Sequence, residues 1–276
     1  MQKHTTQKGF TLVELAIVMT IIGLLIGGIL KGQELMENAR VTATVAQVKG
    51  FEAATTSFRD AYSGMPGDLT SAAGRLPGCT ATCTVTYTAA ATGSVGDNIV
   101  GSNAWGAGTA WANQSPALTT AAQTTIAAEA SLFWLHLLQA NLIGGVTNEA
   151  MTANQAGAWN VTHPAAKIGG GFLVGWATGS NMPGDTSAGA HGPSGHVLAL
   201  TQLPTSAINA TGAAGSYPLA AARAAQLDRK LDDGRPASGF VQAYGILATC
   251  LTAVATLSYN EAVTTRDCGV VFRIQG

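Results

Sequence analysis

The longest apolar stretch of the chain runs over residues 10–30, and Glu14 is its one charged residue. It contains no proline, so no residue in it breaks a helix by removing a backbone donor. At about 1.5 Å per residue, a helix of this length just spans a bilayer core of roughly 30 Å. The pattern therefore predicts a helix over 10–30 that meets lipid or neighbouring subunits.

The helical pattern continues beyond this stretch, because the first proline is Pro66, which lies within a glycine-rich stop signal. Between 41 and 62 apolar residues recur at spacings of three or four, which is typical of an amphipathic helix. They are Val41, Val45, Val48, Phe51, Ala54, Phe58 and Tyr62. We therefore expect one long helix over 10–62, whose second half packs on a globular domain of residues 63–276.

The rest of the chain alternates short apolar runs with connections rich in glycine and other turn residues. Alternation predicts strands at 84–88, 172–176, 196–200, 240–247 and 270–274. Helical spacing predicts helices at 119–141 and 218–231, with Pro218 as the first residue of the second. The predicted fold class is α+β: a long N-terminal helix packed on an antiparallel sheet, with extra helices.

Composition and charge indicate an exported protein. Only 11% of the 276 residues are charged, 34 are glycines, and the formal net charge is −1. Lys3 and Lys8 precede the apolar stretch, so the positive-inside rule places the N-terminus in the cytoplasm and the later residues outside the inner membrane. Disulfides form in that compartment. The sequence contains no basic patch of the kind that nucleic-acid binding needs.

The segment from Lys8 to Leu15 reads Lys-Gly-Phe-Thr-Leu-Val-Glu-Leu and follows a short basic leader. With the apolar stretch, it resembles the class III signal of type IV pilins and pseudopilins. The resemblance implies that a prepilin peptidase removes the leader, residues 1–9, by cutting between Gly9 and Phe10, and that the new amine of Phe10 is methylated. The alternatives are a plain membrane anchor or a secretory signal peptide, which would be cut after its apolar core.

Glu14 needs a partner if it lies in lipid, where a carboxylate costs about 2.5 kcal/mol or more at the bilayer centre. The free amine of Phe10 after cleavage, from the same or a neighbouring subunit, would supply one. We therefore expect Glu14 to act in assembly. The alternative is a carboxylate at the membrane edge that lipid headgroups solvate.

The resemblance implies a structural subunit of a type IV pilus or related filament, and not an enzyme. Its partners would be copies of itself in a helical filament, prepilin peptidase, the inner-membrane assembly machinery and, before assembly, membrane lipid. A pseudopilin of a type II secretion system and a membrane-anchored periplasmic binding protein are the alternatives. Many major pilins carry a proline where this chain has Lys31, so a main and a minor subunit both stay open.

The four cysteines, Cys79, Cys83, Cys250 and Cys268, allow three connectivities. Pairing neighbours joins the first two and the last two, and the late pair resembles the C-terminal disulfide loop of type IV pilins. A zinc site is the alternative, although the spacing fits it poorly. His136 lies on an apolar helix face and is interpreted as a packed or partly exposed histidine rather than a metal ligand, because no second ligand sits one turn away.

The segment 227–236 gathers the carboxylates of Asp228, Asp232 and Asp233 at the end of a predicted helix. Carboxylates at that end oppose the helix dipole, so something should offset them. Neighbouring basic residues, such as Arg229 and Lys230, are one explanation. A Ca²⁺ ion, which prefers carboxylate and carbonyl oxygens, is the other, and the segment resembles a stretch near the calcium site of some pseudopilins.

Overall fold

The computed structural model describes residues 9–85, 96–101, 128–147, 157–179, 192–204, 217–246, 248–252 and 257–274. The chain divides into two compact units, residues 1–40 and 41–276. The long helix α1 spans Leu12–Tyr62, so its second half belongs to the second unit.

The second unit combines short helices with a sheet. Its helices are the second half of α1, α2 (Ala72–Arg75), the 3₁₀ helix η1 (Ala81–Cys83), α3 (Ala128–Gln139) and α5 (Ala221–Leu231). Its strands are β1 (Gly171–Thr178), β2 (Ser194–Thr201), β3 (Leu219–Ala220), β4 (Val241–Gly245) and β5 (Arg266–Arg273).

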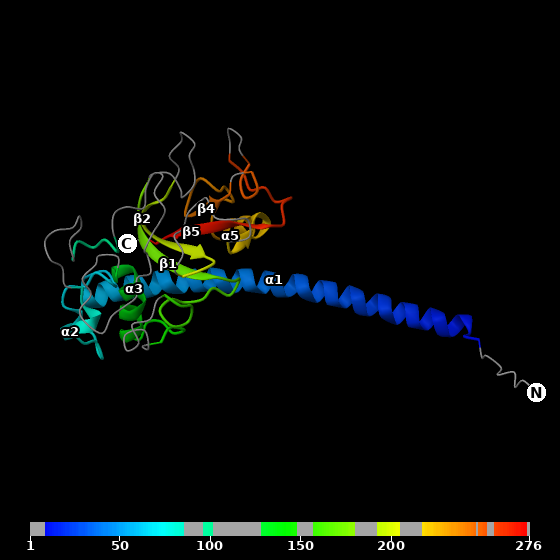
Figure 1. Cartoon of the computed structure of the whole chain (residues 1–276), viewed down its shortest axis with the longest axis horizontal. Coiled ribbons are helices and arrows are strands. Elements are labelled where there is room, and N and C mark those ends of the chain that lie inside the picture. The colour runs from blue at the N-terminus through cyan, green and yellow to red at the C-terminus, as the bar shows by residue number, and fades with distance from the viewer. Residues whose placement is uncertain are drawn as a thin grey trace, which may run out of the picture. The chain divides into compact units, whose positions relative to one another are not determined.

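The pairings between these five strands are antiparallel, and Figure 1 shows the sheet beside the second half of α1. β1 pairs with β2 along its whole length, and β2 pairs with β5. β4 and β3 also pair with β5, which makes β5 the strand that joins the sheet together. Together with the helices, this sheet confirms the predicted α+β class.

The core lies between the sheet and the second half of α1, where the predicted apolar stripe is largely buried. Phe51 of α1 packs its ring against Trp134 of α3, at a centroid distance of 5.0 Å, and against Phe172 of β1, at 5.4 Å. Alternate residues of β1 lie on opposite faces: Phe172 joins this core and Leu173 a second cluster. The period of two predicted from the sequence is therefore confirmed.

Several boundaries differ from the predictions. The placement of Pro218 as the first residue of a helix is wrong, because α5 begins only at Ala221. Leu219 instead pairs with Cys268 of β5 and is buried, so the pairing with the sheet outweighs the local helix signal. Part of the predicted helix over 119–141 and most of the predicted strand over 84–88 lie outside the described residues.

Candidate functional site

The N-terminal part of α1 exposes its apolar side chains. Between Leu12 and Leu30, the large apolar side chains are each 45% to 86% exposed. Among the described residues, α1 is the one helix long and apolar enough to cross a membrane. A continuous apolar surface of this kind marks a membrane or protein contact.

A capping box begins α1. The Thr11 hydroxyl oxygen accepts a hydrogen bond from the Glu14 amide at 3.2 Å. In return, Oε2 of Glu14 accepts hydrogen bonds from the amide and the hydroxyl of Thr11, each at 2.8 Å. This reciprocal arrangement satisfies amides that the first turn of a helix leaves without partners. The sequence interpretation missed it, although Thr-x-x-Glu before an apolar run is its signature.

The predicted cleavage site lies directly before this cap. Gly9 and Phe10 precede the helix and are exposed, with Phe10 92% exposed. The bond between them is therefore in exposed, non-helical backbone. In the uncut chain, the polar partner that the structure provides for Glu14 is Thr11.

The four cysteines form two disulfides, Cys79–Cys83 and Cys250–Cys268. Both members of the second bridge are fully buried, and it ties the turn after β4 to the strand β5. Of the three connectivities, this is the one that joins sequence neighbours. It agrees with an extracytoplasmic unit, since disulfides persist in oxidising compartments.

His136 bridges two loops from within α3. The Gly67 amide donates a hydrogen bond to its Nδ1 at 2.8 Å, and Nε2 lies 2.8 Å from the Cys83 carbonyl oxygen. Because Nδ1 accepts, the ring proton must sit on Nε2, which donates to Cys83. Both nitrogens are engaged, so His136 is a structural residue, as expected.

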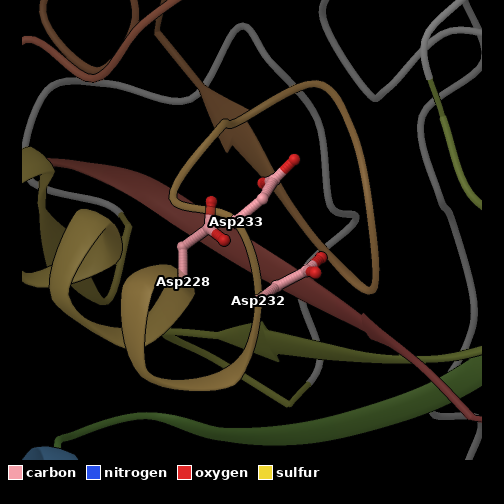
Figure 2. Close-up of side chains that lie close together, drawn as sticks. All are labelled: Asp228, Asp232 and Asp233. Carbon is pink, nitrogen blue, oxygen red and sulfur yellow. The ribbon is translucent and has the colours of Figure 1, made fainter.

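The predicted carboxylate cluster lies at the end of α5 (Figure 2). One oxygen from each of Asp228, Asp232 and Asp233 lies within 4.8 Å of the others. Asp228 is buried, whereas the other two are exposed. Oxygens on opposite sides of a Ca²⁺ ion lie at a similar separation, because each sits 2.3–2.6 Å from the metal.

Each of these carboxylates already accepts hydrogen bonds from the chain. Asp228 accepts from the Gly234 amide at 3.0 Å and from the Tyr259 hydroxyl at 2.7 Å. Asp232 accepts from the two backbone amides that lead into β4. Asp233 accepts from an amide and a hydroxyl of the loop that follows it. These bonds offset the unfavourable helix dipole without an ion.

Two of the basic neighbours, Arg229 and Lys230, have other partners. Arg229 forms an ion pair with Glu261, and Lys230 donates a hydrogen bond to the Thr42 hydroxyl at 2.7 Å. Burial raises the pKa of Asp228 to about 6. Calcium at this turn stays a prediction of the sequence.

A comparison of the sequence with known protein families agrees with the exposed apolar helix and the capped start of α1. Residues 4–30 match the family model of the prokaryotic N-terminal methylation motif. This motif is the prepilin-type cleavage and methylation signal of type IV pilins and pseudopilins. No curated protein and no solved structure matches the chain. The motif, the exposed apolar helix and the α+β fold together indicate a pilin-like or pseudopilin-like precursor.

Proposed function

We propose that this chain is a structural subunit of a type IV pilus or a related filament. The observation that carries the proposal is the N-terminal part of α1, which bears the methylation motif and leaves its apolar side chains exposed. The hydrophobic effect penalises such a surface in water. Lipid covers it before assembly, and the same segments of neighbouring copies cover it in the filament.

The leader is removed between Gly9 and Phe10 by a prepilin peptidase, which also methylates the new amine. The exposed, non-helical backbone at this bond supports the proposal. Mass spectrometry of the mature protein should find N-methyl-Phe10 as its first residue. A mature chain that still begins at Met1, or that begins beyond Leu30, would contradict the proposal.

Glu14 pairs with the Phe10 amine of a neighbouring subunit during assembly. In an apolar surrounding, desolvation offsets much of the attraction between the two charges, so the pair sets the register of subunits more than it adds stability. The capping box gives the same carboxylate a second, local role. A test must therefore separate the charge of Glu14 from its cap.

Three variants make this separation. Glu14→Gln removes the charge but keeps the cap, because glutamine serves at this position of a capping box. Thr11→Val removes the hydroxyl of the cap but keeps the charge. Glu14→Ala removes the charge and the half of the cap that the Glu14 side chain supplies, while the backbone amide of residue 14 can still donate to Thr11. Each variant is co-expressed with the wild-type chain, and its share of sheared filaments is measured by mass spectrometry.

We expect Glu14→Gln and Glu14→Ala to be incorporated at least tenfold less than the wild-type chain, and Thr11→Val to be incorporated nearly as well. Membrane insertion should be unchanged in all three. If Thr11→Val fails like Glu14→Ala while Glu14→Gln assembles normally, Glu14 acts through the cap and the pairing proposal is wrong.

Filaments also separate this proposal from a membrane-anchored binding protein. One cavity among the described residues, lined by residues such as Ser131, Leu135 and Val161, has a volume of about 10 Å³, which is room for about one water molecule and too little for a small-molecule ligand. Electron microscopy that finds no filament, on the surface or after overexpression in the periplasm, would contradict the filament proposal.

A further inference from the structure

Glu129, on the first turn of α3, is a fully buried carboxylate. Its Oε2 accepts a hydrogen bond from the Gly101 amide at 2.8 Å, whereas its Oε1 is buried and has no hydrogen-bond partner. Other unpartnered buried atoms, such as Nε1 of Trp134 and Oε1 of Gln242, belong to neutral side chains. A buried carboxylate oxygen without a partner is far more costly than a neutral one.

Asp68 is held close to Glu129 by the turn that precedes it. Gly67 packs against the backbone of α3: a Cβ atom at Gly67 would lie 2.3 Å from the Glu129 carbonyl oxygen. The backbone of Gly67 also has a φ angle of +91°, which residues other than glycine rarely adopt. The turn therefore brings Asp68, which is only 2% exposed, to the start of α3.

The segment 96–101 joins the two carboxylates. The amides of Gly96 and Asn98 donate hydrogen bonds to Asp68, the latter at 2.6 Å, and the Gly101 amide donates to Glu129. Since Oε2 of Glu129 is bound at the end of this segment, the unpartnered Oε1 of the same carboxylate also lies beside it. The backbone of this segment therefore contacts both buried carboxylates, those of Asp68 and Glu129.

The local sequence offers these acids no basic partner. Residues 76–166 contain no lysine or arginine, so neither α3 nor the segment 96–101 can supply a positive charge. Burial is the main reason that the pKa of Glu129 is raised to about 9, and the charges of Asp68 and Asp97 contribute to that rise. Burial also raises the pKa of Asp68 to about 6.

We propose that Glu129 and Asp68 bind a divalent cation, with Ca²⁺ as the natural choice. The ligands are carboxylate oxygens, which suit Ca²⁺ and Mg²⁺ rather than the softer transition metals. Asp97 adds negative charge nearby, and water molecules complete the coordination shell. The bound ion gives Oε1 of Glu129 its missing partner and links the turn after α1 to α3. This site is separate from the acidic turn at the end of α5.

The test titrates CaCl₂ into the full-length chain in detergent, stripped of metal, and measures the heat of binding. Glu129→Gln is the main variant because it keeps the shape of the side chain and removes its charge, and Asp68→Asn is the second. The double variant Asp232→Asn, Asp233→Asn is the matched control, since it removes charge only from the acidic turn. MgCl₂ is titrated in parallel.

We expect the wild-type chain and the control to share one Ca²⁺ site that is lost, or weakened at least tenfold, in Glu129→Gln and Asp68→Asn. In chelator, Glu129→Gln should melt at or above the wild-type temperature, because it no longer buries an acid without a partner. In the wild-type chain, Ca²⁺ should also slow hydrogen exchange at residues 96–101. Equal Ca²⁺ binding by wild type and Glu129→Gln, or no binding of either ion by the wild-type chain, overturns the proposal.

Discussion

His136 makes the stability of the globular unit depend on pH in a way that can be measured. The imidazole is fully buried and accepts a hydrogen bond from the Gly67 amide through Nδ1. Protonation would place a second N–H opposite that donor and a charge in the core. Burial accordingly lowers the pKa of His136 from 6.5 to about 4.

The direction follows from linkage. The folded-state pKa lies below the unfolded value, so the unfolded chain binds the proton more tightly. The stability that neutral His136 contributes is therefore complete above pH 6.5 and is lost as the pH falls toward 4. One such group lowers the free energy of unfolding by about 2.5 kcal/mol between pH 7 and pH 4.5.

The perturbation is His136→Asn, whose amide oxygen replaces Nδ1 as an acceptor but does not titrate. At pH 7 the variant should be about 1–3 kcal/mol less stable, because the Cys83 carbonyl loses its donor. That deficit should shrink by about 2.5 kcal/mol at pH 4.5. Urea unfolding of the full chain in detergent, followed by near-ultraviolet circular dichroism, measures both values.

The control is Leu138→Ala on the same helix, which removes packing but no titratable group. Its stability should lie below that of the wild-type chain by a constant amount at every pH. His163 and His196, whose pKa values burial also lowers, are present in all three chains and cancel in the comparison. If the curves of the wild-type chain and His136→Asn run parallel from pH 7 to pH 4.5, the assignment of His136 is wrong.

Three further predictions concern the sheet and its connections. Replacing Cys250 and Cys268 together by serine should lower the free energy of unfolding by about 3 kcal/mol in non-reducing urea titrations, and reduction of the wild-type chain, which also opens Cys79–Cys83, should lower it by at least as much. Gly269→Ala should cost about 2 kcal/mol or more, because its Cβ would lie 2.1 Å from the Tyr244 ring; a thermal melt checks it, and Gly144→Ala, where the space is open, is the control. Tyr259→Phe removes the hydrogen bond to the buried carboxylate at the end of α5 and should cost about 1–3 kcal/mol in urea; no change would show that this bond adds nothing.

The spacing of apolar residues predicted the parts of the fold in which a single helix or strand buries one face. The spacing of apolar residues in the second half of α1 identified side chains such as Val41, Val48 and Phe58, all of which are buried. The alternating runs of β1 and β2 were placed correctly because each strand separates two apolar clusters. A local pattern suffices where burial repeats with the period of the element itself.

Long-range contacts were not predictable in this way. The apolar face expected on α3 covers only part of that helix, whereas every residue from Ala128 to Leu137 is buried. Glu129 is buried by neighbours such as Gly67 and Gly101, which lie far away in the sequence. No spacing rule brings these segments together. The capping box at Thr11 and Glu14, in contrast, was readable from four adjacent residues and was overlooked because Glu14 was interpreted through its charge alone.

The buried polar side chains of this protein differ in whether the chain itself supplies all their hydrogen-bond partners. The chain itself satisfies His136 with one amide and one carbonyl, and Asp228 with one amide and one hydroxyl. These residues define local geometry, and both nitrogens of His136 and both oxygens of Asp228 have hydrogen-bond partners within the chain. Glu129 has one oxygen satisfied and one without a partner, and residues 76–166 around it in the sequence contain no lysine or arginine. Because desolvation penalises an unsatisfied carboxylate most strongly, that difference marks Glu129, rather than the more conspicuous acidic turn, as the place where a ligand has the most to stabilise.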